Sequence, residues 1–139
     1  ALDNGIATDA FGRSSDPAIW AAGDCASFPW KGGRIRLESV GNAIDQGEIV
    51  AENMLGAAKP YEAKPWFWSD QGNLKVQIAG TRDHDDILVR RTDDPPSLSL
   101  FYVSNGRLAG VESVNNPKGF LQARRLIGEG APMDAALLL

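Results

Sequence analysis

Gly23 and Asp24 are the residues in this chain best suited to meet a ligand. They follow a short apolar run, Ala18 to Ala22, which Pro17 precedes. A run this short between turn-forming residues predicts a buried strand of the parallel type, and open α/β sheets bind ligands at the carboxyl edge of such strands. Gly23 permits close approach to the backbone, and Asp24 offers two oxygen acceptors that suit sugar hydroxyl groups. The alternative is an ordinary strand ended by a turn that Asp24 caps.

A helix is predicted from Ser39 to about Leu55, directly after Glu38. Ser39 is a candidate cap for its start, and Gly56 follows its end. Its first turn directs backbone N–H groups and a partial positive charge at whatever lies beyond it. The alternative is a surface helix that packs its apolar side on a sheet. The residues with helical apolar spacing are Val40, Ala43, Ile44, Ile49, Val50, Ala51 and Met54.

The second half of the chain predicts an antiparallel sheet. Four alternating segments, 74–80, 86–92, 97–103 and 108–114, are joined by short turns, one of them Asn105-Gly106. Pro117 begins a helix that ends near residue 127, and Pro132 is expected to begin a final one. A polar stretch between Pro60 and Pro65 is typical of a linker. The predicted fold class is α+β, with a piece of an α/β domain at 1–58 and a β-meander with one or two helices at 59–139.

Composition excludes several classes of protein. The 139 residues carry a net charge of −4, which leaves no basic surface for nucleic acid. One cysteine, Cys25, permits neither an internal disulfide nor a C-x-x-C pair, and we expect it to be an inert small apolar residue. His84 stands among acidic residues that point in alternate directions, so no metal site is expected. With no membrane-length apolar run and no signal-peptide pattern, a cytoplasmic location is expected.

Three motifs in order carry a resemblance to a known family. Residues 5–16 with 19–24 resemble the second flavin fingerprint of the two-dinucleotide-binding-domain flavoproteins, in which an apolar strand ends in A-x-G-D. Residues 38–47 resemble the helix that starts under the flavin ring. Residues 65–71, Pro-Trp-Phe-Trp-Ser-Asp-Gln, resemble the P-x-F-W-S-[DE]-Q signature of the FAD-dependent ferredoxin reductases. The resemblance extends over essentially the whole chain.

This resemblance implies an enzyme that passes electrons from NAD(P)H through FAD to a [2Fe–2S] ferredoxin or rubredoxin serving an oxygenase. No side chain is expected to act as an acid or base, so no catalytic residue is predicted. The alternative interpretation of Glu38 is a carboxylate that is simply exposed to solvent. The alternative interpretation of the aromatic residues after Pro65 is that they fill the hydrophobic core. The residues implied to contact FAD are Gly23, Asp24, Glu38, Ser39, Val40 and one of the pair Phe67 and Trp68.

The chain also departs from the family pattern. The reductases are much longer and carry two G-x-G-x-x-G fingerprints, whereas this chain has none. We therefore expect a C-terminal fragment that lacks the N-terminal FAD and NAD domains and is inactive alone. Bare apolar surface on such a fragment predicts self-association, which light scattering measures. The competing hypothesis is a docking or dimerisation module with no cofactor.

Overall fold

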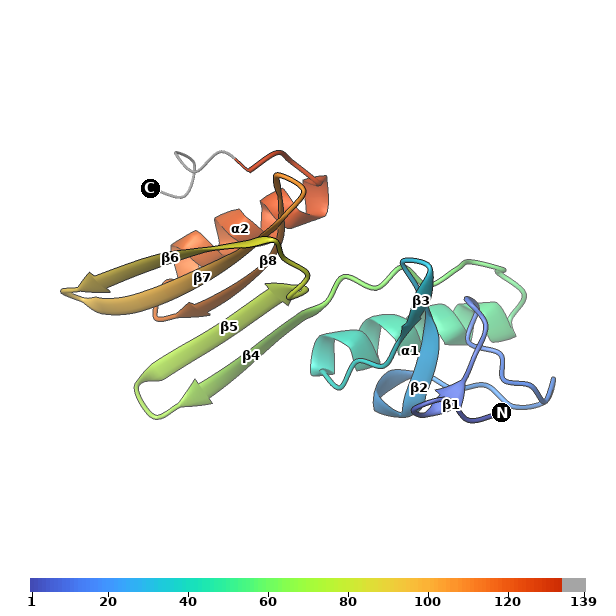
Figure 1. Ribbon diagram of the computed structural model, residues 1–139. Helices are drawn as coiled ribbons and strands as arrows, with labels where there is room; N and C mark the ends of the chain where they lie inside the picture. The colour runs from blue at the N-terminus through green and yellow to red at the C-terminus, as the bar shows by residue number, and fades with distance from the viewer. Residues whose placement is uncertain (134–139) are drawn as a thin grey trace. The chain divides into compact units, whose positions relative to one another are not determined.

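The computed structural model describes residues 1–133 and divides into two compact units, Ala1–Pro65 and Trp66–Leu139 (Figure 1). Each unit has its own small hydrophobic core. The first unit combines a three-stranded sheet with one helix. The second combines a five-stranded sheet with one helix. This is the α+β class that the sequence predicts.

The first unit is built from very short strands. It contains β1 (Ile6–Ala7), the 3-10 turn η1 (Gly23–Cys25), β2 (Ala26–Trp30), β3 (Gly33–Ile35) and α1 (Val40–Met54). β1 pairs with β2 in parallel, and β2 pairs with β3 in the antiparallel direction. Its buried apolar residues are Ala21, Ala26 and Phe28, which form one cluster, and Val50 on α1. Since so little apolar surface is buried, polar contacts must order much of the unit.

The strand predicted at Ala18–Ala22 is wrong. This segment is a loop in which Asp16 accepts hydrogen bonds from the backbone of Ala18 and Ile19, and Trp20 makes one isolated bridge to Arg13. Ile19 is 50% exposed. The strand comes later, at β2. The Gly23–Asp24 step therefore precedes a strand instead of following one.

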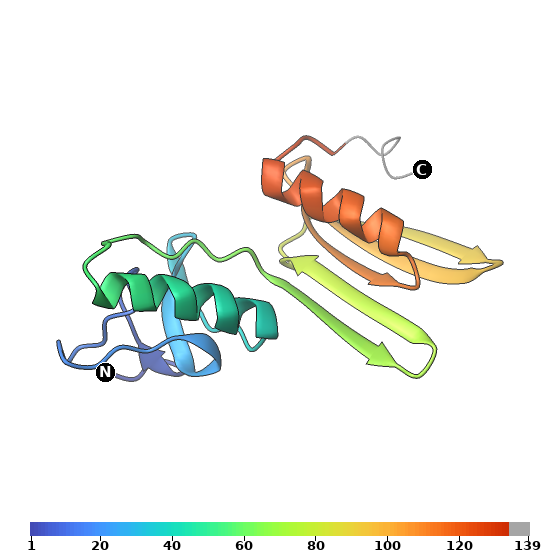
Figure 2. The same ribbon diagram turned by 180° about the vertical axis from the view of Figure 1, so that it is seen from behind.

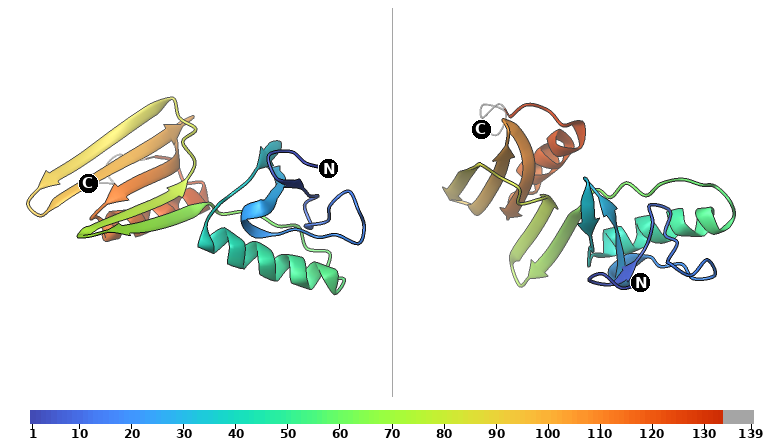
Figure 3. Two further views of the ribbon diagram at one scale, coloured as in Figure 1. Left: turned by 90° about the horizontal axis from the view of Figure 1, so that it is seen from below. Right: turned by 45° about the vertical axis from the view of Figure 1, so that its right-hand side comes forward.

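The second unit is one antiparallel sheet with a helix on it. Its elements are β4 (Trp66–Gln71), β5 (Leu74–Gly80), β6 (Asp86–Asp93), β7 (Pro96–Ser104), β8 (Arg107–Val114) and α2 (Pro117–Glu129). The strand order is β4-β5-β8-β7-β6, so β4 and β6 form the two edges (Figure 3). α2 lies across one face of the sheet (Figure 2). Asn116 caps the start of α2, and Gly130 ends it in the left-handed conformation.

The four strands predicted in this half are confirmed, and so is the helix that begins at Pro117. The simple meander is wrong in two respects. β4 is a fifth strand, which was not predicted in the aromatic run at its start, and β8 lies between β5 and β7 in the sheet. The helix expected from Pro132 lies largely outside the described residues. The buried cluster between α2 and the sheet consists of Ala79, Phe101, Leu108, Val111, Phe120, Ala123 and Leu126.

Candidate functional site

The Gly23–Asp24 step forms the turn η1 and packs against α1. Gly23 is buried with a φ of +76°, in the left-handed region that favours glycine. A Cβ atom at this position would lie 3.4 Å from Cβ of Ala43, so turn and helix are in close contact. Asp24 is exposed. The turn thus presents a carboxylate to solvent from a closely packed backbone.

Arg36 joins this turn to the segment that leads into α1. Its Nη1 donates to the backbone oxygen of Asp24 at 3.0 Å and forms an ion pair with Glu38. The Glu38 side chain is 61% exposed. One nitrogen of Arg36 therefore contacts both the backbone of Asp24 and the carboxylate of Glu38, the two acidic residues predicted from the sequence to meet a ligand.

The amino end of α1 is capped and carries no acidic side chain in its first turn. Oγ of Ser39 accepts a hydrogen bond from the backbone N–H of Asn42 at 3.3 Å, which confirms the predicted cap. Val40, the first helical residue, is 58% exposed. The first backbone N–H groups of a helix give its amino end a partial positive charge. This end of α1 is therefore suited to an electron-rich group of a ligand.

The buried side of α1 is mostly polar, and of the predicted apolar residues only Val50 is buried there. Asn42, Gln46 and Asn53 are 5%, 1% and 2% exposed, whereas Ile44 and Met54 are 55% and 60% exposed. The helix packs on turns and loops whose backbone groups need hydrogen-bond partners, and amide side chains supply both donors and acceptors. The sequence pattern missed this because apolar residues occupy the outer side.

Asn53 ties the segment after α1 to the first unit. Its Nδ2 donates to the backbone oxygens of Phe11 at 3.0 Å and Lys59 at 2.8 Å, and its Oδ1 accepts from the backbone N–H of Lys59 at 2.7 Å. Tyr61 continues the attachment with a backbone hydrogen bond to Ala10. The stretch expected to be a linker is thus hydrogen-bonded to the loops of this unit.

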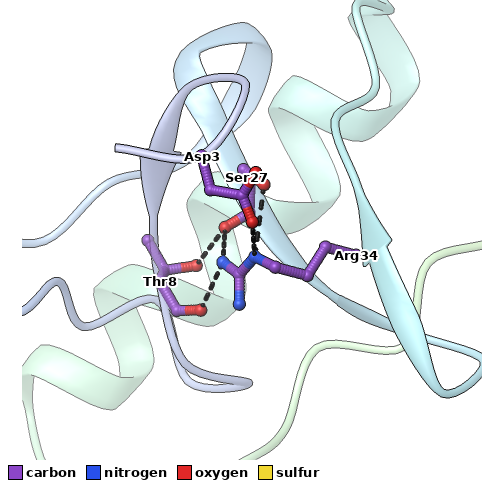
Figure 4. Close-up of polar contacts among 4 residues, drawn as sticks. All are labelled: Asp3, Thr8, Ser27 and Arg34. Atoms are coloured by element: carbon purple, nitrogen blue, oxygen red, sulfur yellow. Dashed lines mark hydrogen bonds and ion pairs between the residues drawn. The ribbon is translucent and has the colours of Figure 1, made fainter. Parts of the chain in front are cut away.

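Arg34 braces the small sheet that precedes the site (Figure 4). It donates to the backbone oxygens of Thr8 and Ser27, with the Thr8 contact at 2.9 Å, and its Nε lies 3.5 Å from a carboxylate oxygen of Asp3. Thr8 also donates its hydroxyl to the Ser27 oxygen at 3.4 Å. One β3 side chain therefore joins the ends of β1 and β2, which compensates for their shortness.

Phe67 and Trp68 belong to the second unit, on β4. They are 42% and 36% exposed and, as neighbours in a strand, point to opposite faces of the sheet. Trp66 stacks on Trp68 with ring centroids 5.0 Å apart, and the Arg124 guanidinium lies 4.3 Å from the Trp66 ring centroid. Trp66 and Trp68 are therefore held as a pair, and Phe67 stands apart from them.

The structure thus gathers five of the seven predicted residues in the first unit. Those five are Gly23, Asp24, Glu38, Ser39 and Val40. Sequence reasoning missed the residues that hold them, which are Arg36, Asn42, Gln46 and Tyr61. The available signal was the amide pair at positions 42 and 46, one helical turn apart on the same side of α1.

Cys25 and His84 are the other side chains that the sequence analysis considered for chemistry. Cys25 is exposed, not shielded as expected of a structural cysteine. Nδ1 of His84 lies 2.5 Å from the backbone oxygen of Arg82. Within residues 1–133, no three or more His, Cys, Asp or Glu side chains gather in a way that would hold a metal ion. Within the same residues, no helix has the length and apolar character needed to span a membrane.

Tyr61 gives the first unit a predictable pH dependence. Burial, followed by the negative charge of Asp45, raises the pKa of Tyr61 from 10.0 to about 12. Because the folded-state pKa is the higher one, the stabilisation is complete below pH 10 and is lost as the pH rises through about 12. We expect the urea-unfolding free energy of this unit to fall across that window, followed through the amide signals of Ala26 and Phe28.

Tyr61→Phe is the matched control for this titration. Without the phenol, the free energy of unfolding should change less steeply with pH over the same window. An equally steep fall in the variant would show that other groups cause it.

Comparison with known proteins follows the division between the units. Residues 66–139 match the family described as reductase C-terminal, and residues 1–47 match the pyridine nucleotide-disulphide oxidoreductase family. The chain belongs to the reductase C-terminal family. This agrees with the resemblance carried by the motifs at 5–24, 38–47 and 65–71.

Relatives of this reductase C-terminal chain are ferredoxin reductases of bacteria. Rhodocoxin reductase of Rhodococcus erythropolis is 42% identical over 95% of this chain, and putidaredoxin reductase of Pseudomonas putida is 37% identical over 99%. Among solved structures, the ferredoxin reductase for the CYP199A2 system of Rhodopseudomonas palustris has a TM-score of 0.89, 39% identity and 98% coverage of this chain. The chain spans about a third of these relatives, 32%, 33% and 34% of their lengths respectively.

Proposed function

We propose that this chain is the C-terminal part of an FAD-dependent oxidoreductase that takes electrons from NAD(P)H and passes them to a [2Fe–2S] ferredoxin. Membership of the reductase C-terminal family and the ferredoxin reductases among its relatives support this proposal. The structural observation that carries it is the exposed carboxylate of Asp24 on a turn packed against α1.

The residues of the first unit fit part of a flavin nucleotide. Asp24 would accept hydrogen bonds from ribityl hydroxyl groups, because its carboxylate is exposed and offers two oxygen acceptors. The amino end of α1, at Ser39 and Val40, would face a flavin carbonyl oxygen. Glu38, held by Arg36, would lie at the edge of the same site. Bound FAD would supply hydride acceptance and single-electron release, while the chain's own residues bind and orient it.

The second unit would contribute aromatic contacts. We propose that Phe67 or Trp68 meets the edge of the isoalloxazine ring. The stack of Trp66 on Trp68 favours Trp68, because it restricts the rotation of that side chain. An acidic ferredoxin is the proposed partner, with rubredoxin as the alternative, and the proposed location is cytoplasmic. The crystallised complex of putidaredoxin reductase with putidaredoxin supports a partner of the ferredoxin class.

Asp24→Ala tests the proposal in a full-length protein. A hybrid in which this chain replaces the corresponding third of rhodocoxin reductase supplies the rest of a flavoprotein. We expect the hybrid to purify with FAD and the variant to bind FAD at least about tenfold more weakly, since a hydrogen bond to a charged group contributes about 1.5–3 kcal/mol. Flavin absorbance and fluorescence titration measure both effects.

Glu48→Ala is the matched control, because Glu48 is an exposed carboxylate on α1 away from the helix start. It should leave flavin binding unchanged. If Asp24→Ala also leaves the flavin content unchanged, the flavin proposal fails, and the docking or dimerisation module, with self-association of the chain, becomes the better account.

A further inference from the structure

Polar side chains of the first unit form a continuous hydrogen-bonded series. Oη of Tyr61 donates to Oδ1 of Asn42 at 3.0 Å, and Nδ2 of Asn42 lies 3.5 Å from Oε1 of Gln46. Oε1 of Gln46 accepts from the backbone N–H of Gly23 at 2.8 Å. The series therefore runs from the segment after α1, through the helix, to the turn that carries Asp24.

The contacts at each end determine how the two amides are oriented. Nδ2 of Asn42 also donates to the backbone oxygen of Leu37 at 3.1 Å, which leaves its Oδ1 to accept from Tyr61. Oε1 of Gln46 faces two N–H donors, so turning this amide over would bring its own N–H groups against them. Both amides are thus held in one orientation.

Gly23 depends on this acceptor because of its place in the fold. It is buried, has a positive φ, and lies in a 3-10 turn outside the strand ladders. A buried backbone N–H that loses its partner costs about 1–3 kcal/mol. Without the oxygen of Gln46 the turn would move to satisfy that N–H group, and Asp24 would move with it.

We propose that Gln46 is a positioning residue for flavin binding, with Asn42 and Tyr61 holding it in place. Gln46 and the helix start at Ser39 lie on the same rigid helix, about two turns apart. Gln46 therefore helps to set how far the Asp24 carboxylate stands from the amino end of α1, together with Arg36, which contacts the Asp24 backbone. This inference rests on the proposed flavin site and assigns a function to the polar inner side of α1.

The first test needs no flavin and uses the 139-residue chain. Gln46→Met removes the acceptor at nearly constant volume, and Glu48→Met makes the same replacement at an exposed position on the same helix. We expect amide hydrogen exchange at Gly23, measured by NMR, to be at least about tenfold faster in Gln46→Met and unchanged in Glu48→Met. Unchanged exchange at Gly23 in Gln46→Met overturns the inference.

Gln46→Glu keeps the inference testable if the methionine variant does not fold. It places a carboxyl oxygen where Oε1 lies and retains an acceptor for Gly23 and Asn42. Slow exchange at Gly23 should therefore be retained in the glutamate variant. A folded Gln46→Glu chain with fast exchange at Gly23 would show that the acceptor is not what holds the turn.

The second test measures flavin affinity in the rhodocoxin reductase hybrid. We expect Gln46→Met to weaken FAD binding about tenfold, a free-energy difference of about 1.4 kcal/mol. If Gln46 acts through Asp24, the double variant should bind FAD no more weakly than Asp24→Ala alone. A merely structural role predicts instead that the two losses add, or that Gln46→Met lowers stability without changing affinity.

The outcomes separate this inference from the proposed function. If Asp24→Ala binds FAD normally, the flavin site fails, and the exchange rate at Gly23 still decides whether Gln46 holds the turn. If Asp24→Ala loses FAD while Gln46→Met binds it normally, the flavin site stands and the positioning role is overturned.

Discussion

Replacing Gly110 with alanine is expected to unfold the second unit. A Cβ atom at this position would lie 2.0 Å from the backbone oxygen of Thr81 and 2.9 Å from its carbonyl carbon. Gly110 is on β8, where it pairs with Gly80 on one side and Tyr102 on the other. Because β8 has a hydrogen-bonded strand on each side, it cannot move away from one without leaving the other.

Two opposing effects decide the size of this change. Alanine restricts the unfolded chain more than glycine does, which favours folding by about 0.5–1 kcal/mol. The clash is with backbone atoms that no rotamer change can move, and relieving it costs about 3 kcal/mol or more. The clash therefore outweighs the gain, and a unit of this size has little stability in reserve.

Gly128→Ala is the matched control in the same unit. Gly128 lies in α2. Apart from its chain neighbours and the backbone of its own helix, no heavy atom of residues 1–133 lies within 4 Å of the position its Cβ would take. Alanine there should raise the unfolding free energy by up to about 1 kcal/mol. Urea titration followed through the amide signals of Phe101 and Val111 measures both variants. A stable fold in Gly110→Ala would show that β5 and β8 separate more readily than their pairing indicates.

Truncating Phe120 to alanine is expected to lower the unfolding free energy of the second unit by about 3–5 kcal/mol. Phe120 is 1% exposed and is the largest side chain that α2 places against the sheet, in contact with the cluster around Phe101 and Val111. Its removal leaves a cavity, because the strands beneath it are held by their own hydrogen bonds and cannot close the space.

Leu121→Ala is the neighbouring control. Leu121 is 61% exposed on the outer side of α2, so its truncation should change the stability by no more than about 0.5 kcal/mol. The Phe120 variant should also disturb Trp66, which the Arg124 side chain of α2 covers. Tryptophan fluorescence then reports the loosening of α2 together with urea unfolding. Equal effects from the two truncations would contradict the packing described here.

The site combines residues that no single local pattern connects. Asp24 and Glu38 are 14 positions apart in the sequence, and Arg36 contacts both. The same unit uses Arg34 in a comparable way to join β1, β2 and β3. In a unit with so small an apolar core, long side chains that bridge backbone segments provide order that packing alone does not.

The sequence alone determined the elements whose signals are local. β5, β7 and β8 were predictable because alternation reports which residues face a sheet, and Asn105 and Gly106 both take the positive φ that a tight hairpin requires. α1 was predictable from helical spacing and from the Ser39 side chain at its start, and α2 from Pro117 in its first turn. The strand predicted before Gly23 was misplaced, whereas the family assignment carried by the motif at 5–24 agrees with the family match at residues 1–47.

Tertiary structure decided the order of the strands, which side of α1 is buried, and which residues hold the site in place. Only pairing across the sheet places β8 between β5 and β7. Apolar spacing correctly placed Val50 on the buried side of α1 but wrongly placed Ile44 and Met54 there. The loops beneath the helix offer backbone N–H and C=O groups, and Asn42, Gln46 and Asn53 satisfy them. Periodicity in the sequence reports only the polarity of each residue. Which residues become buried also depends on the hydrogen-bond partners that the opposing surface requires, and that surface forms only when segments distant in the sequence meet.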